Sequence, residues 1–211
     1  RIFDTRQDAQ SAELIRGDGS RSGPLSDAGA NLFNSWPGLS GEGVWLNYTV
    51  IAGESGGFST VYSGGGSAPD VSNINFAPNE VRANSVAVMK GAQGVAFNIS
   101  TPSHGIADVA AQLSDAGLKL TPIAPRRVID TRASIPVSSE TVLEVNPQVP
   151  ADAEGVIFTL TAVPDDDDGF LTAFPCGQEV PNASNVNFRA RTPVANSVIS
   201  KLGGGRLCIY S

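Results

Sequence analysis

SNVNF (Ser184–Phe188) is the stretch that decides the fold, because nearly the same word, SNINF, occurs at Ser72–Phe76. Each word is followed by ANSV, which begins at Ala83 and again at Ala195, so both pairs of words are 112 residues apart. Three further pairs of segments repeat: GVWLNYTV (Gly43–Val50) with GVIFTLTA (Gly155–Ala162), GFSTVY (Gly57–Tyr62) with GFLTAF (Gly169–Phe174), and RIFDTR (Arg1–Arg6) with RVIDTR (Arg127–Arg132). Such repetition predicts two copies of one structural unit.

The repeat divides the chain into two predicted domains. The first unit spans residues 1–120 and the second spans residues 121–211, and each is large enough to bury its own core. The first copy carries an insertion at 7–23, which is polar and rich in Gly and Ser, as surface loops are. It also continues through a linking segment at 101–125, for which the second copy has no counterpart. We therefore expect the second unit to lack its closing strand.

The composition and the strand patterns predict an all-β protein. Charged residues make up 17% of the chain, while there are 23 Gly and 14 Pro, a balance that suits many short strands joined by turns. Each GV segment is followed by a turn and a GF segment, which is typical of a β-hairpin. We predict two tandem homologous antiparallel β-sandwich-like domains. One segment is ambiguous, because Ile106, Val109, Ala110 and Leu113 fit a helical stripe and periodicity alone predicts a short helix at 105–120.

The charge of the chain disfavours several classes of partner. The net charge is −7 and the pI is near 4.6, and no Lys/Arg cluster provides the basic face of a nucleic-acid binder. Binding to anionic membrane surfaces is disfavoured for the same reason. No apolar run approaches the roughly 20 residues of a membrane span. Because the sequence begins inside a repeat word at Arg1, we expect a leader or a longer N-terminus to precede it.

The two cysteines, Cys176 and Cys208, both lie in the second copy, where the first copy has Gly64 and Ala96. Their joint absence from the first copy favours a disulfide over two independent buried thiols. Such a crosslink stabilises by roughly 3–4 kcal/mol in the chain-entropy model. It also predicts an oxidising, extracytoplasmic compartment, so we expect an extracellular or cell-surface protein.

The order of the words resembles that of a repeat family found in secreted, multi-repeat surface proteins of actinobacteria and other environmental bacteria. The matching words are DTR, LNYTV, GFLTAFPC, both SNxNF words, both ANSV words and LCIYS. The resemblance implies an all-β extracellular module with no catalytic activity of its own. It also implies a closing strand, which is present once here as IADVAAQL (Ile106–Leu113) and favours a strand over a helix from Ala107 to Leu113.

Polar residues recur at corresponding positions of the two copies. In each DTR word the Asp and the Arg are two residues apart, so they share a face of a strand and can pair. The SNxNF words place two Asn on one face, and a third Asn follows in ANSV. We interpret all of these as a structural polar clamp that ties loop backbones; the alternatives are a ligand-binding Arg and a sugar-binding Asn row flanked by Phe76 or Phe188. The clamp residues are Asp4, Arg6, Asp130, Arg132, Asn73, Asn75, Asn84, Asn185, Asn187 and Asn196.

Three other motifs point to specific chemistry. The acidic run Asp165, Asp166, Asp167 and Asp168 lies in a predicted hairpin turn; a solvated turn is favoured, and a weak Ca²⁺ site is the one cofactor that it indicates. Arg16–Asp18 spells RGD, an integrin-type motif that also occurs by chance. Gly53–Gly57 fits G-x-S-x-G, but the hairpin context and the single His104 do not provide the elbow and the partner that a Ser55 nucleophile requires.

These observations predict a non-enzymatic extracellular structural or adhesive protein. An unpaired edge at the second unit invites pairing with another chain, and a chain open at one end could assemble head to tail into a surface filament. The expected partners are further copies or a neighbouring surface protein. The alternative is a carbohydrate-binding cell-surface module with glycan ligands, and a third hypothesis is a hydrolase that uses Ser55.

Overall fold

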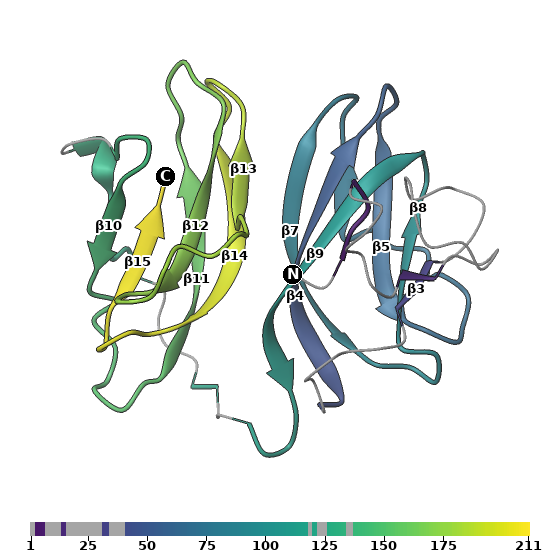
Figure 1. Ribbon diagram of the computed structural model, residues 1–211, viewed down its shortest axis with the longest axis horizontal. Helices are drawn as coiled ribbons and strands as arrows, with labels where there is room; N and C mark the ends of the chain where they lie inside the picture. The colour runs from purple at the N-terminus through teal and green to yellow at the C-terminus, as the bar shows by residue number, and fades with distance from the viewer. Residues whose placement is uncertain are drawn as a thin grey trace. The chain divides into compact units, whose positions relative to one another are not determined.

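The computed structural model describes residues 3–6, 14–15, 31–33, 41–117, 120–121, 126–133 and 137–211. The chain divides into two compact units, Arg1–Asp115 and Ala116–Ser211, close to the boundary after Leu120 that the sequence predicts. Both units consist of antiparallel sheets (Figure 1). Within the described ranges the one helical element is a 3₁₀ turn, η1 (Thr131–Ala133). The all-β class is therefore confirmed.

The first unit is built from two sheets. One sheet has the strand order β1-β9-β4-β7 and the other has the order β2-β3-β8-β5-β6. The first sheet contains β1 (Phe3–Asp4), β4 (Gly43–Ala52), β7 (Val81–Met89) and β9 (Ser103–Leu113). The second contains β2 (Leu14–Ile15), β3 (Asn31–Phe33), β5 (Gly57–Ser63), β6 (Ile74–Phe76) and β8 (Val95–Ile99).

The core of the first unit lies between its two sheets. Alternate residues of β4 point into it, because successive side chains of a strand lie on opposite faces. From the other sheet β8 contributes Phe97, whose ring centroid lies 5.2 Å from that of Tyr48. Two sheets that share one apolar layer form a sandwich. The inward residues of β4 are Val44, Leu46, Tyr48 and Val50, all fully or almost fully buried.

The helix that periodicity predicts at 105–120 is wrong, because β9 is a strand from Ser103 to Leu113. Its ladder with β4 contains a bulge opposite Trp45 and Leu46. The partners of these two residues are Ala111 and Val109, so Ala110 is the extra residue. A bulge interrupts the period of two, and the apolar spacing therefore imitates a helix.

The second unit has the same kinds of strand pairs in smaller sheets. One sheet has the order β10-β15-β12-β13 and the other is the pair β11-β14. Residues of both sheets form one core cluster, and Figure 1 shows the two layers of this unit. The strands are β10 (Val142–Val145), β11 (Gly155–Ala162), β12 (Gly169–Pro175), β13 (Val186–Phe188), β14 (Val194–Lys201) and β15 (Leu207–Tyr210).

Strand registers in the two units correspond. Gly57 pairs with Phe76 in the first unit, and Gly169 pairs with Phe188 in the second. The long ladders likewise start at matching pairs, Gly43 with Met89 and Gly155 with Lys201. The sheets differ in width: β4 lies between β7 and β9, whereas β11 pairs with β14 alone among the strands that the structure describes.

Candidate functional site

Two asparagines in each unit tie the sheets together. The Asn73 Oδ1 accepts a hydrogen bond from the Val61 N–H at 2.5 Å, and the Asn84 Nδ2 donates to the Asn73 carbonyl at 2.6 Å. Because Asn73 immediately precedes β6 and Asn84 lies in β7, the second bond joins the two sheets. The second unit repeats both bonds, from the Ala173 N–H to the Asn185 Oδ1 and from the Asn196 Nδ2 to the Asn185 carbonyl, each at 2.7 Å.

The remaining asparagines of the SNxNF words face away from the cores. The Asn75 Nδ2 donates to the Ser72 Oγ at 3.0 Å. The Asn187 Oδ1 accepts from the Ser184 Oγ at 3.1 Å, whereas the Asn187 Nδ2 has no hydrogen-bond partner in the described part of the chain. Phe76 and Phe188 pack with the cores, so they do not flank a sugar-binding row.

An aromatic pair that the sequence did not single out lies on the outer face of the second unit. Phe170 pairs across strands with Asn187, and it is 42% exposed. Its ring centroid lies 6.0 Å from that of Tyr210. Phe58 and Asn75 occupy the corresponding positions of the first unit, pair across strands in the same way and are also exposed.

The first DTR word closes the edge of β9. The Arg6 Nε donates to the Asp4 Oδ1 at 2.9 Å, and a second guanidinium nitrogen lies 2.7 Å from the Asp4 Oδ2. The Thr5 N–H donates to the Gly105 carbonyl at 3.0 Å, and the Gly105 N–H donates to the Thr5 Oγ1 at 2.9 Å. The side-chain hydrogen bond with Asp4 raises the pKa of Arg6, and the charges of Asp4 and Asp108 act in the same direction.

The second DTR word has the same internal geometry, but no strand in the described part of the chain lies beside it. The Arg132 Nε donates to the Asp130 Oδ1 at 2.9 Å, and a second nitrogen lies 2.6 Å from the Asp130 Oδ2. The hydrogen bond from Arg132 holds the pKa of Asp130 well below its ordinary value near 3.8, and Arg127 adds a contact at 2.7 Å. The Asp130 side chain is 27% exposed, against 4% for Asp4. The clamp therefore forms within the word itself, but it is buried only in the unit that has β9.

The acidic turn of the second unit contacts the loop that joins β13 to β14. The Asp166 Oδ1 accepts from the Arg191 Nε at 2.7 Å, and the Asp168 Oδ1 accepts from the Ala190 N–H at 2.8 Å. The Asp165 carbonyl accepts from the Arg191 N–H at 2.7 Å. In the described part of the chain no group of three or more His, Cys, Asp or Glu side chains could hold a metal ion.

The motifs that suggested other chemistry are not brought together. Ser55 lies exposed in the turn between β4 and β5. The His104 Nδ1 lies 3.2 Å from the Thr5 Oγ1 and 3.1 Å from the Thr5 carbonyl oxygen, so it belongs to the first DTR clamp. The RGD word lies outside the described residues, as does all but 14–15 of the 7–23 insertion.

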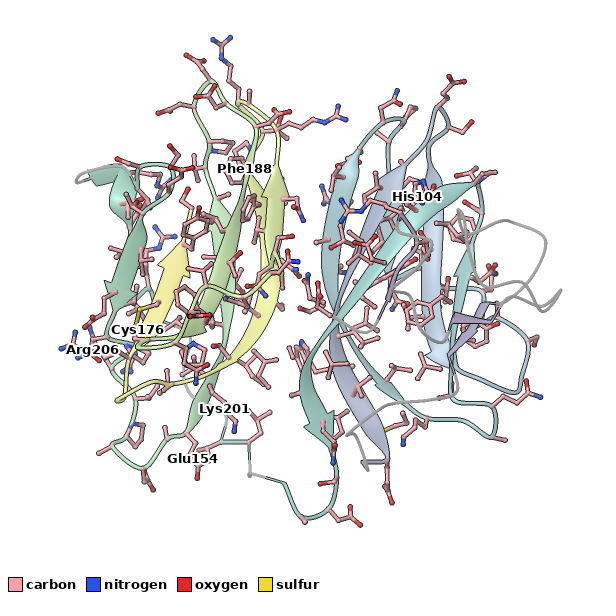
Figure 2. The ribbon with its side chains drawn as sticks, viewed as in Figure 1. His104, Glu154, Cys176, Phe188, Lys201 and Arg206 are labelled. Carbon is pink, nitrogen blue, oxygen red and sulfur yellow. A yellow bond between two sulfur atoms is a disulfide. The ribbon has the colours of Figure 1, made fainter. Side chains whose placement is uncertain are left out.

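Cys176 and Cys208 form a disulfide with an S–S distance of 2.01 Å, as the sequence predicts. Cys176 directly follows β12 and Cys208 lies in β15, so the bond crosslinks two hydrogen-bonded strands of one sheet (Figure 2). The crosslink is compatible with an oxidising compartment. No helix among the described residues is long and apolar enough to cross a membrane.

The candidate interaction site is the side of β11 that faces away from β14 and that no described strand covers, which we call the free side of β11. The Leu202 N–H donates to the Glu154 carbonyl at 2.9 Å, which directs the Glu154 carbonyl toward β14. Main-chain groups of successive strand residues alternate in direction, so Ile157, Thr159 and Thr161 direct their N–H and C=O groups away from β14. Ile157 is 41% exposed, and both threonines are exposed. The described residues provide no strand for these groups.

The first unit shows what covers the corresponding side of β4. Thr49, which corresponds to Thr161, pairs with Ile106 of β9, and Asn47, which corresponds to Thr159, pairs with Asp108. Aligning the two copies within the chain predicted a missing strand. It did not identify which main-chain groups have no strand beside them in the described part of the second unit.

Comparison with protein-family models, with curated proteins and with solved structures found no match. The resemblance to a surface-protein repeat family therefore rests on the sequence words alone.

Proposed function

We propose that the protein is a non-enzymatic, extracellular structural subunit that assembles head to tail by pairing the free side of β11 with a strand of a neighbouring subunit. The observation that carries this proposal is that the main chain of Ile157, Thr159 and Thr161 has no strand beside it among the described residues. Unpaired strand edges are templates for pairing with another chain. A contact between different surfaces of identical subunits generates filaments when the rotation does not close.

The proposal treats the two units as homologous copies of one sandwich module. The corresponding registers and the repeated Asn ties support this treatment. It follows that the edge of β11 is the place where a strand fits, because the matching edge of β4 carries one. The disulfide supports the extracellular location, because disulfides persist in oxidising compartments.

The test is assembly in solution together with a variant that blocks the edge. Sedimentation velocity over a range of concentrations, with negative-stain electron microscopy, should show concentration-dependent species and filaments. Thr159→Pro removes an N–H that faces away from β14, a position where an edge strand tolerates proline, and should abolish assembly. Thr159→Val keeps that N–H and is the matched control. A chain that stays monomeric at high concentration, or that assembles equally well with Thr159→Pro, would overturn the proposal.

A second candidate function is glycan binding on the outer face of the second unit. The specific observation is the exposed Phe170 ring beside Tyr210, with Asn187 opposite Phe170 on the neighbouring strand. Aromatic rings and amides together suit a ligand with one apolar and one polar face. A glycan array should give hits that Phe170→Ala and Asn187→Ala remove and that Asn75→Ala in the first unit leaves unchanged. An array without hits eliminates this function.

A further inference from the structure

We infer that the donor strand, meaning the strand that pairs with the free side of β11, is of the β9 type: an antiparallel segment with small or aliphatic residues facing inward and an aspartate facing outward. This inference rests on the proposed function, because it specifies the partner of the same edge. Its template is the first unit, where β9 pairs with β4 from Gly43–Leu113 to Ala52–Ser103.

The inward face of the donor is specified by the apolar surface that β11 leaves open. In the first unit Ala107 is buried in the core and Val109 packs against it, opposite Tyr48 and Leu46. Leu46 is 0% exposed. Its counterpart Phe158 is only half-buried and lies at the margin of the second core. A donor with an aliphatic residue opposite Phe158 would bury the rest of this ring. A charged residue there would weaken binding, because its charge would be buried without a partner.

A second, independent feature of the second unit points to the same occupant. In the first unit β9 has β1 on its other side, with Phe3 opposite Ala107 and Asp4 opposite Ile106. The corresponding residues 128–130 of the second unit form no strand. Val128 is 37% exposed and Ile129 is 44% exposed, although such β-branched residues favour strands. The half-buried ring of Phe158 and the exposed side chains of Val128 and Ile129 have a single explanation. Each would be covered by a strand that lies between β11 and residues 128–130.

The outward face of the donor is specified by the second DTR clamp. Asp108 on the outer face of β9 contributes to the raised pKa of Arg6. Arg132 has the same arrangement with its own aspartate, and its side chain is 61% exposed. When residues 128–130 take the place of β1, Arg132 takes the place of Arg6, and the charge of a donor aspartate at the position of Asp108 acts on it as the charge of Asp108 acts on Arg6. The charge pair selects for an acidic outward residue.

The experiment uses the full chain and the synthetic peptide SHGIADVAAQL, which has the sequence of Ser103–Leu113. Isothermal titration at a concentration below that of any self-assembly measures binding, and hydrogen exchange maps it. We expect amide protection in β11, at Ile157, Thr159 and Thr161, and in residues 128–132. Protection of neither segment, or of β11 alone, would overturn the inference.

Matched peptides and proteins test the specified pattern. A peptide with Val109→Asp places a carboxylate against Phe158, so it should bind at least about 100-fold more weakly. A peptide with Asp108→Asn, or the protein with Arg132→Gln, should bind about 3- to 10-fold more weakly. Combining the two changes should weaken binding no more than either change alone. Thr159→Pro should weaken binding at least about 10-fold, and Thr159→Val should not. Equal binding of the native and Val109→Asp peptides would overturn the inward pattern.

The outcomes separate this inference from the proposed function. If the chain forms filaments that the peptide neither binds nor caps, self-assembly stands and the β9-type donor is wrong. If the peptide binds as described and the chain remains monomeric, the donor is right and head-to-tail self-assembly is wrong.

Discussion

The two units use the same local hydrogen bonds but differ in how completely their long strands are paired. The β5–β6 and β12–β13 hairpins share one register, and the same Asn bonds join the sheets in both units. By contrast, β4 has neighbours on both sides and β11 has one among the described residues. The hairpins, the Asn bonds and the long β4–β7 ladder are thus reproduced in the second unit, whereas the width of the sheet depends on β9, for which the described residues of that unit provide no counterpart.

The two cores also differ in the residues at one pair of corresponding positions. In the first unit the Tyr48 hydroxyl lies 3.0 Å from the Ser59 Oγ, deep inside the core. The corresponding positions of the second unit hold Leu160 and Leu171, which belong to or pack against its core cluster. A buried polar contact is thereby replaced by apolar side chains, which removes two groups that require partners. The disulfide then crosslinks only the smaller unit.

The largest expected difference between the units comes from truncating one inward residue of each long strand. Leu46→Ala should destabilise the first unit by about 3–5 kcal/mol, because the side chain is fully buried. Phe158→Ala should cost the second unit roughly half as much, because its ring is partly in solvent. Fluorescence of Trp36 and Trp45 reports the unfolding of the first unit alone, since the second unit has no tryptophan, and hydrogen exchange reports the second. Equal losses would show that the face of β11 is covered as fully as that of β4.

Removing the disulfide should affect only the second unit. The double change Cys176→Ser and Cys208→Ser should lower its free energy of unfolding by about 3–4 kcal/mol, while tryptophan fluorescence should give an unchanged transition. The reciprocal change, Gly64→Cys with Ala96→Cys, should not stabilise the first unit by a similar amount. A Cβ at Gly64 would lie 2.9 Å from the Gln93 carbonyl oxygen, closer than main-chain contacts allow. Comparable stabilisation by this second pair would show that the first unit accepts the same crosslink.

The Asn ties should contribute equally in both units. Asn73→Ala and Asn185→Ala each leave a partly buried main-chain N–H without its acceptor, which should cost about 1–3 kcal/mol in the respective unit. Asn75→Ala is the control, because that side chain is exposed and bonds only to Ser72 in the described structure, and it should change stability by less than about 0.5 kcal/mol. A large difference between the first two variants, measured by unit-resolved hydrogen exchange, would contradict equivalent ties.

The composition and the strand patterns predicted the all-β class, and the joint absence of both cysteines from the first copy predicted the disulfide. The predicted hairpin of each GV segment with its GF segment is wrong, because β4 and β5 lie in different sheets, as do β11 and β12. The repeat could not assign β9, since the bulge at Ala110 replaces the period of two by a pattern that resembles a helix. It also could not predict that Asp4 is more buried than Asp130. Identical words form identical Asp–Arg pairs, and the neighbouring strand β9 buries the Asp4 pair. The exposed Phe170–Tyr210 pair was missed because an aromatic residue in a strand is usually assigned to the core.

The smallest expected effect is the titration of the second clamp. Because the pKa of Asp130 is lowered in the folded chain, its ion pair contributes fully above the ordinary value near 3.8, and this contribution is lost as the pH falls below that value through the folded pKa. Carbon NMR of the carboxyl group should therefore show Asp130 ionised well below pH 3.8. Arg132→Gln should return the midpoint toward 3.8, and Arg127→Gln should shift it less, because the Arg132 hydrogen bond is the largest cause. An Asp130 midpoint near 3.8 in the native chain would show that the second DTR pair does not persist in solution, and a β9-type donor would then have no preformed clamp to meet.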